Sequence, residues 1–205
     1  MKYPWLDIAH ELQSIAQSGL TFGENKYDVE RYEQILNLSK KILADFTDAD
    51  FEKVSGLLDN EVGYLTPKVD VRGVVFKDDK ILMVKETIDD CWSLPGGWAD
   101  VGLSPRESVE KELLEEAGIE VFSERLLAVM DKKFHQHPPD VNYVYKLFIL
   151  CSAKDHNIKT GMETSDVDYF SQTNLPTLSE PRNTINQINK MFELKDQPDE
   201  HVYFD

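Results

Sequence analysis

The chain has 205 residues, of which 41% are hydrophobic and 29% are charged, the composition of an ordinary globular protein. No apolar stretch approaches the roughly 20 residues that a membrane-spanning helix needs, and the first residues lack the apolar core and small-residue cleavage site of a secretory signal. The net charge of −16 disfavours broad nucleic-acid binding, because an acidic surface repels phosphate backbones. This charge is equally compatible with an acidic site that requires a divalent cation and with a need for solubility.

The two cysteines, Cys91 and Cys151, lie far apart in apolar, strand-like runs. Such positions are typical of reduced core residues rather than of a disulfide framework. The sequence therefore predicts a cytoplasmic protein.

The first sixty or so residues show helical periodicity. One run begins at Trp5 and has a stop signal at Gly19, a second follows the expected cap Asp28, and a third covers residues 51–58. Three short amphipathic helices bury little surface alone, so we expect them to pack on the rest of the chain or on a second subunit. We interpret residues 1–65 as a small all-helical domain that serves as a dimerisation element, and its many acidic side chains make it a poor phosphate binder.

From about Lys68 onward the pattern is typical of strands. An alternating run leads into a hairpin turn at residues 77–80, and further strands are expected at 81–84, 126–130, 143–150 and 168–170. One helix follows the Gly-Gly pair, and a last helix is expected to start near Pro181 and run through Met191. Strands, one helix, more strands and one helix predict an α/β (α+β) sandwich with a mixed sheet rather than a doubly wound sheet.

The helix after the Gly-Gly pair has clear end signals. Ser104 can cap it, Pro105 suits its first position and Glu107 completes a capping box. Gly118 can end it as a left-handed cap. We therefore expect a helix from about 105 to 117.

Three carboxylates share one face of that helix: Glu112, Glu115 and Glu116, at spacings of three and four residues. Like charges at this spacing repel by a few tenths of a kcal/mol per pair, and the last turns of a helix disfavour negative charge. Converging hard oxygen ligands suit Mg²⁺ or Mn²⁺, which would relieve the repulsion. A solvated glutamate-rich face is the simpler alternative for the three residues taken alone.

This segment resembles the Nudix box, G-x5-E-x7-R-E-U-x-E-E-x-G-U, in which U is aliphatic. Two positions depart from the pattern, because Leu103 stands where the box has Glu and Lys111 where it has Arg. In the family those two side chains are associated with an ion pair that steadies the loop and helix. The matching positions are Gly97, Glu112, Leu113, Glu115, Glu116, Gly118 and Ile119.

The resemblance implies a Nudix-type α/β/α sandwich for residues 66–205 and a pyrophosphohydrolase activity. It implies that Glu112 and Glu116 are the main ligands of Mg²⁺, or of Mn²⁺, joined by Glu115 and the backbone carbonyl of Gly96. The metal would orient the diphosphate and activate a water for in-line attack at phosphorus.

The general base and the substrate contacts are less sharply indicated. Family members often take a further carboxylate from a late loop, and Glu163 is the first candidate, with Asp166 second; a solvated loop acid is the alternative. Substrate-binding candidates, each of which could instead be an ordinary surface or packing residue, are Trp98, His135, His137, Tyr143 and Tyr145.

A second resemblance covers nearly the whole length. The helical extension and the run from Leu94 to Gly102 are similar to the Bacillus-type CDP-choline pyrophosphatases, which are often labelled ADP-ribose pyrophosphatases and form dimers. This similarity implies hydrolysis of CDP-choline to CMP and phosphocholine. Alternatives are hydrolysis of ADP-ribose to AMP and ribose 5-phosphate, processing of RNA ends, and a sensor that binds a nucleotide sugar without cleaving it.

Overall fold

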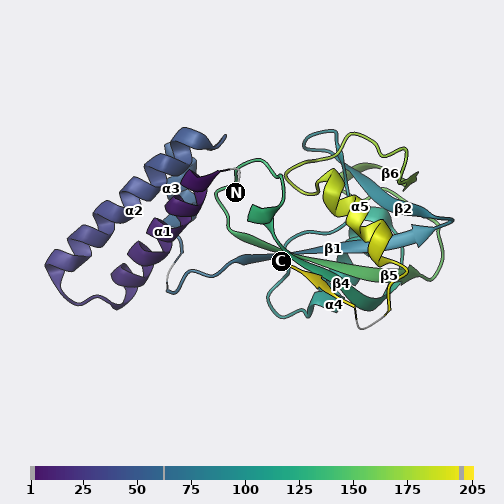
Figure 1. Ribbon diagram of the computed structural model, residues 1–205, viewed down its shortest axis with the longest axis horizontal. Coiled ribbons are helices and arrows are strands. Elements are labelled where there is room, and N and C mark those ends of the chain that lie inside the picture. The colour runs from purple at the N-terminus through teal and green to yellow at the C-terminus, as the bar shows by residue number, and fades with distance from the viewer. Residues whose placement is uncertain (1–2, 62, 199–200) are drawn as a thin grey trace. The chain divides into compact units, whose positions relative to one another are not determined.

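The computed structural model describes residues 3–61, 63–198 and 201–205 (Figure 1). The chain divides into two compact units. The first, the helical unit, comprises residues up to Pro67 together with Pro139–Tyr143; the second, the sheet unit, comprises Lys68–Pro138 and Val144–Asp205. No helix among the described residues is long and apolar enough to cross a membrane.

The helical unit consists of α1 (Pro4–Phe22), α2 (Lys26–Phe46) and α3 (Phe51–Leu58). The predicted stop at Gly19 is wrong, because α1 continues to Phe22. Gly19 instead permits close packing of α2, since a Cβ there would lie 2.4 Å from ring atoms of Tyr32. The predicted cap at Asp28 is also wrong: Asn25 caps α2 and accepts a hydrogen bond from the backbone N–H of Tyr27.

A short segment from later in the chain completes the helical unit. Val141 joins the core of this unit, and Nε2 of His10 donates to the Val141 carbonyl at 2.9 Å. The ring of Tyr143 meets the His10 ring edge-on at 5.5 Å between centroids. Residues 139–143 therefore pack with the helices.

The sheet unit is built on seven strands in the order β3-β2-β1-β5-β4-β7, with β6 paired to β2. The β1–β5 and β4–β7 pairs are parallel and the other pairs are antiparallel. The predicted hairpin turn is confirmed, with Asp78 and Asp79 both at positive φ, as a tight two-residue turn requires. The strands are β1 (Lys68–Lys77), β2 (Lys80–Glu86), β3 (Trp92–Ser93), β4 (Val121–Asp131), β5 (Val144–Ala153), β6 (Thr164–Ser171) and β7 (Tyr203–Phe204), and a 3-10 turn, η1 (Lys132–Phe134), follows β4.

Two helices cover opposite faces of this sheet, α4 (Pro105–Ala117) and α5 (Ile185–Leu194) (Figure 1). One apolar core lies under α4 and a second lies under α5. The last helix does not start near Pro181 as predicted but at Ile185, where Thr184 provides the cap. The predicted α/β sandwich with a mixed sheet, preceded by helices, is confirmed.

Both cysteines are free thiols. Cys151 is buried in β5, whereas Cys91 is partly exposed and lies just before β3, outside the strands.

Candidate active site

The loop that carries the two glycines runs beside β1 as an extra, irregular strand. The N–H of Gly73 donates to the Pro95 carbonyl and that of Val71 to the Gly97 carbonyl, both at 2.8 Å. The N–H of Ala99 donates to Val69 at 2.9 Å. This edge of β1 is available because β1 pairs with β2 only at its end, from Phe76 onward.

Gly96 and Gly97 bring the loop against α4. Gly96 has φ +137°, and a Cβ there would lie 2.1 Å from the Val71 carbonyl oxygen. Its N–H donates to Oε2 of Glu116 at 2.8 Å. A Cβ on Gly97 would lie 3.2 Å from Oε1 of Glu112. The loop therefore meets both outer members of the glutamate trio.

The end signals of α4 are confirmed. Ser104 and Glu107 form the capping box, and Pro105 occupies the first turn. Gly118 ends the helix with φ 67°, a left-handed conformation that costs glycine little. The two caps fix the first and last residues of α4, and therefore the positions of the glutamates along it.

Burial raises the pKa of two glutamates on α4, Glu112 and Glu116. The pKa of Glu116 is raised to about 7, chiefly by burial, with nearby Glu86 and Glu112 adding to the rise and the Gly96 N–H and Arg72 opposing it. Burial also raises the pKa of Glu112, which is partly exposed. Two adjacent carboxylates held in a partly dry environment favour a compensating cation.

The carboxylate oxygens of the three glutamates suit a hard divalent cation, but they do not converge on one point. Among the described residues, no cluster of three or more His, Cys, Asp or Glu side chains is placed to hold a metal ion. Glu115 is exposed, and its Oε2 lies 3.6 Å from Nζ of Lys111. Binding of Mg²⁺ by all three glutamates would therefore require Glu115 to turn away from Lys111, and the ligand assignment stays a prediction.

The two positions that depart from the Nudix box lie at the surface of this site. Lys111 contacts Oδ2 of Asp100 at 2.8 Å, while the Leu103 side chain is exposed. An ion pair between the loop and α4 is therefore present, with Asp100 as its acidic partner.

Sequence reasoning missed a group of buried charges beside the loop. Arg72 is buried, and its Nε and Nη2 donate to the two carboxylate oxygens of Asp70, each at 2.8 Å. Nζ of Lys146, also buried, lies 3.1 Å from Asp70. Glu86, at the end of β2, accepts from Arg182 at 2.9 Å. Charged residues inside apolar strand runs are the sequence signal that could have indicated them.

The segment that carries Glu163 is attached to the end of α4. Thr164 donates its hydroxyl to the Glu116 carbonyl at 2.8 Å, and Gly161 lies directly against the Glu115 carbonyl. The Glu163 carbonyl accepts from the N–H of Thr87 at 3.1 Å, while its side chain is exposed. Asp166 lies in β6 opposite Lys85 and is also exposed. The choice of general base stays a prediction.

The substrate-binding candidates are dispersed. Trp98 follows the glycine pair directly, forms a bridge with Asp70, and is about half exposed. His135 contacts Asp205 at 3.1 Å. Tyr145 is an exposed residue of β5, whereas Tyr143 packs within the helical unit. Their roles stay predictions.

His137 is a special case among these candidates. It is buried, and its Nδ1 donates to the Glu180 carbonyl at 2.6 Å. Burial lowers the pKa of the His137 imidazole to about 3, so the ring is neutral at physiological pH.

This fold and this glutamate helix define a hydrolase of the pyrophosphatase type. Residues 66–190 match the family model described as the NUDIX domain, and the chain belongs to the Nudix family. Residues 3–58 match a second model, described as a UDP-X-like, N-terminal oligomerisation domain.

Three relatives show the range of similarity. A Bacillus subtilis (strain 168) protein named "Putative ADP-ribose pyrophosphatase YjhB" is 45% identical over 98% of this chain and 97% of its own length. A crystal structure of an ADP-ribose pyrophosphatase from Streptococcus suis is 38% identical, with a TM-score of 0.62, over 68% of this chain and all of that chain. A crystal structure of a UDP-X diphosphatase is 33% identical, with a TM-score of 0.64, over 98% of both chains.

Proposed function

We propose that this Nudix pyrophosphohydrolase cleaves the pyrophosphate bond of a nucleoside diphosphate linked to a sugar, with ADP-ribose as the first substrate, giving AMP and ribose 5-phosphate. The names of the Bacillus subtilis and Streptococcus suis relatives support this choice. CDP-choline, which the sequence resemblance favoured, is named by none of the three relatives described above.

The observation that carries the proposal is the contact of the Gly96–Gly97 loop with two buried or half-buried glutamates. Glu112 and Glu116, with Glu115 and the Gly96 carbonyl, would hold Mg²⁺ or Mn²⁺. A bound metal of this kind neutralises the diphosphate and lowers the pKa of a water. Glu163 would accept the proton of the attacking water.

A substrate panel tests the proposal: ADP-ribose, a UDP-sugar, CDP-choline, a dinucleotide and capped RNA, each with Mg²⁺ or Mn²⁺, followed by phosphorus NMR of the products. We expect turnover of ADP-ribose with AMP as a product. We expect a loss of about 100-fold or more in Glu116→Gln, because a bound metal stabilises the transition state by several kcal/mol. Undiminished turnover by that variant would contradict the mechanism. Tight binding of one member without turnover would favour a sensor.

A UDP-linked substrate is the second candidate. The UDP-X diphosphatase structure matches nearly the whole chain, including the helical unit. Faster turnover of the UDP-sugar than of ADP-ribose, at equal concentration, would select this candidate.

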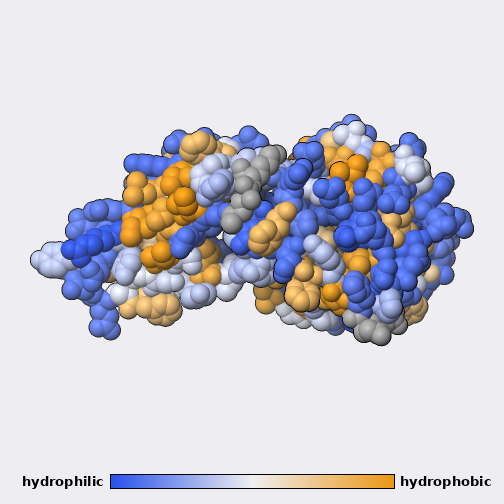
Figure 2. All heavy atoms as spheres, viewed as in Figure 1, coloured by the Kyte–Doolittle hydropathy of each residue, from blue (hydrophilic) through white to orange (hydrophobic). Residues whose placement is uncertain are grey.

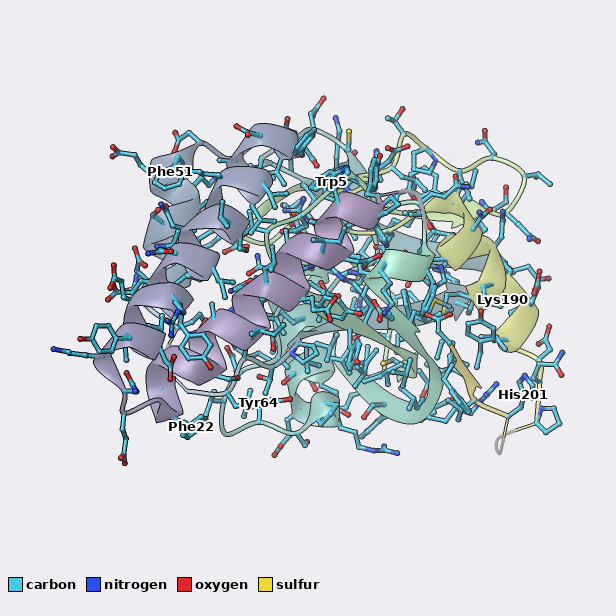
Figure 3. All side chains as sticks on the ribbon, turned by 60° about the vertical axis from the view of Figure 1, so that its left-hand side comes forward. Trp5, Phe22, Phe51, Tyr64, Lys190 and His201 are labelled. Atoms are coloured by element: carbon cyan, nitrogen blue, oxygen red, sulfur yellow. The ribbon has the colours of Figure 1, made fainter. Side chains whose placement is uncertain are left out.

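We also propose that the helical unit mediates a homodimer. The description of its family model supports self-association. Figure 2 shows apolar residues grouped on a face of this unit, and Phe22 and Phe51 lie at its surface (Figure 3). The exposed large hydrophobic side chains of the three helices are Ile8, Ile15, Phe22, Tyr27, Leu38, Phe46, Phe51 and Leu57.

A cytoplasmic location stays a prediction.

A further inference from the structure

The guanidinium group of Arg72 ties the glycine loop to the sheet from inside the protein. The side chain is 4% exposed and extends from β1. Its Nη1 donates to the Leu94 carbonyl at 3.0 Å, two residues before the glycine that bonds Glu116. The backbone N–H of Leu94 is also held in place, because it donates to Oδ1 of Asn183 at 2.9 Å.

Asp70 fixes the orientation of that guanidinium. The two residues form a bidentate pair, the geometry in which an arginine side chain has the least freedom. Burial alone would raise the pKa of Asp70, but the charges of Arg72 and Lys146 lower it. Asp70 therefore stays ionised, and Arg72 is held between a carboxylate on one side and the Leu94 carbonyl on the other.

Arg72 also lies close to the predicted metal ligands and to Glu86. Its charge acts on Glu116, Glu86 and Glu112, and a Cβ on Gly96 would lie 3.0 Å from the Arg72 Cα. Burying two paired charges generally adds little to stability compared with apolar packing. A purely structural role therefore gives no reason for charges at this point of β1.

We propose that Arg72, oriented by Asp70, is a positioning residue that holds the Leu94–Gly97 segment in register with α4, so that the Gly96 backbone and the Glu116 carboxylate form one metal-binding unit. The inference rests on the proposed metal site. Neither residue needs to touch the substrate or the metal. Both act through the Leu94 carbonyl and the loop that follows it.

The test uses the full-length chain and the variants Arg72→Lys and Asp70→Asn. Lysine keeps the positive charge but cannot span both oxygens of Asp70 and the Leu94 carbonyl together, so Arg72→Lys separates geometry from charge. Arg125→Lys is the matched control, because Arg125 donates to the carbonyls of Leu194 and Gln197 at 2.8 and 3.0 Å, away from the loop.

Mn²⁺ binding is measured by electron paramagnetic resonance without nucleotide, alongside melting temperature and the steady-state constants for ADP-ribose. We expect both variants to bind Mn²⁺ about 10- to 100-fold more weakly, the usual effect of losing a residue that orients the metal ligands without touching the metal. We expect kcat to fall by a similar factor with little change in KM, while Arg125→Lys keeps wild-type Mn²⁺ affinity.

The outcomes separate this inference from the proposed function. Wild-type Mn²⁺ affinity in Arg72→Lys, even with a lower melting temperature, would overturn the positioning role alone. Failure of the wild type to bind Mn²⁺, or binding that survives Glu116→Gln unchanged, would overturn the metal site and this inference together. If Arg72→Lys does not fold, the nearly isosteric Asp70→Asn decides in the same way.

Discussion

The backbone N–H of Gly96 donates to Oε2 of Glu116 at 2.8 Å, and this bond joins a loop beside β1 to the last turn of α4. The bond favours the ionised carboxylate, which burial disfavours. Glu116 is therefore held in a fixed direction at an energetic cost. Such a balance is typical of a functional side chain rather than of one selected for stability.

Replacing Gly96 with alanine should displace the loop from β1 and so disturb its hydrogen bond to Glu116. An added Cβ would lie 2.1 Å from the Val71 carbonyl oxygen, and the φ of +137° is strained for any other residue. We expect Gly96→Ala to lower the free energy of unfolding by about 1–3 kcal/mol from strain alone, and activity by a larger factor than that loss explains. Chemical denaturation and steady-state kinetics provide the two measurements.

Gly102→Ala is the matched control for this prediction. Gly102 also has a positive φ, +96°, but an added Cβ there meets nothing within 4 Å. Gly102→Ala should therefore show the loss of stability from backbone strain without displacing the Gly96–Gly97 loop. Equal losses of activity in the two variants would argue against a special role for the Gly96 contact.

Glu116→Gln should stabilise the metal-free protein at high pH while it strongly lowers activity. The folded-state pKa of Glu116 is about 7, above the ordinary glutamate value of 4.5. The contribution of this group to stability is therefore fully present below pH 4.5 and is lost as the pH rises through 7. Removing the charge should therefore recover on the order of 2–3 kcal/mol at pH 8 and little at pH 5.

Melting temperatures in the presence of a chelator, at pH 5 and pH 8, measure this effect. Glu115→Gln is the control, because Glu115 is exposed on the same helix and its replacement should change the melting temperature little at either pH. A wild type that is as stable as Glu116→Gln at pH 8 would show that burial of this carboxylate costs nothing. Saturating Mg²⁺ should reverse the order and make the wild type the more stable protein.

Short sequence motifs correctly predicted the features of this protein that depend only on neighbouring residues. The capping box at Ser104, the turn at Asp78 and the left-handed end at Gly118 are each specified by neighbouring residues, and all three are confirmed. The predicted end of α1 was wrong because Gly19 does not stop the helix. It makes room for the ring of Tyr32 from α2. Charged residues within an apolar run could have indicated Asp70 and Arg72, but the contacts of Arg72 with the Leu94 carbonyl and of Asp70 with Lys146 could not be predicted, because they depend on which loop and strand lie beside β1.

Lys111→Gln should reduce activity only modestly. The contact of Lys111 with Asp100 links the loop to α4, but both side chains are about half exposed, and exposed ion pairs contribute little. We expect kcat to fall less than about tenfold, with a stronger effect at low ionic strength, where screening is weaker. Kinetics of Lys111→Gln, Asp100→Asn and the double variant measure the coupling between the two residues. A loss of activity in Lys111→Gln equal to that in Glu116→Gln would contradict the prediction of a modest effect.

Charges introduced into the apolar surface of α1 should dissociate the proposed dimer. Ile8 and Ile15 are about half exposed and lie seven residues apart, so they share one face of the helix. In Ile8→Glu/Ile15→Glu the two carboxylates would have to be desolvated at an interface, so the assembly should become monomeric. Light scattering coupled to gel filtration measures the mass.

Ile88→Glu controls for the effect of an added surface charge, since Ile88 is exposed in the sheet unit. It should leave the assembly unchanged. A wild type that is monomeric, or a double variant that remains dimeric, would contradict the proposed role of this face. Because the glutamates of α4 belong to the sheet unit, a monomeric double variant should still bind Mn²⁺, and loss of Mn²⁺ binding together with the dimer would instead show that the site depends on the assembly.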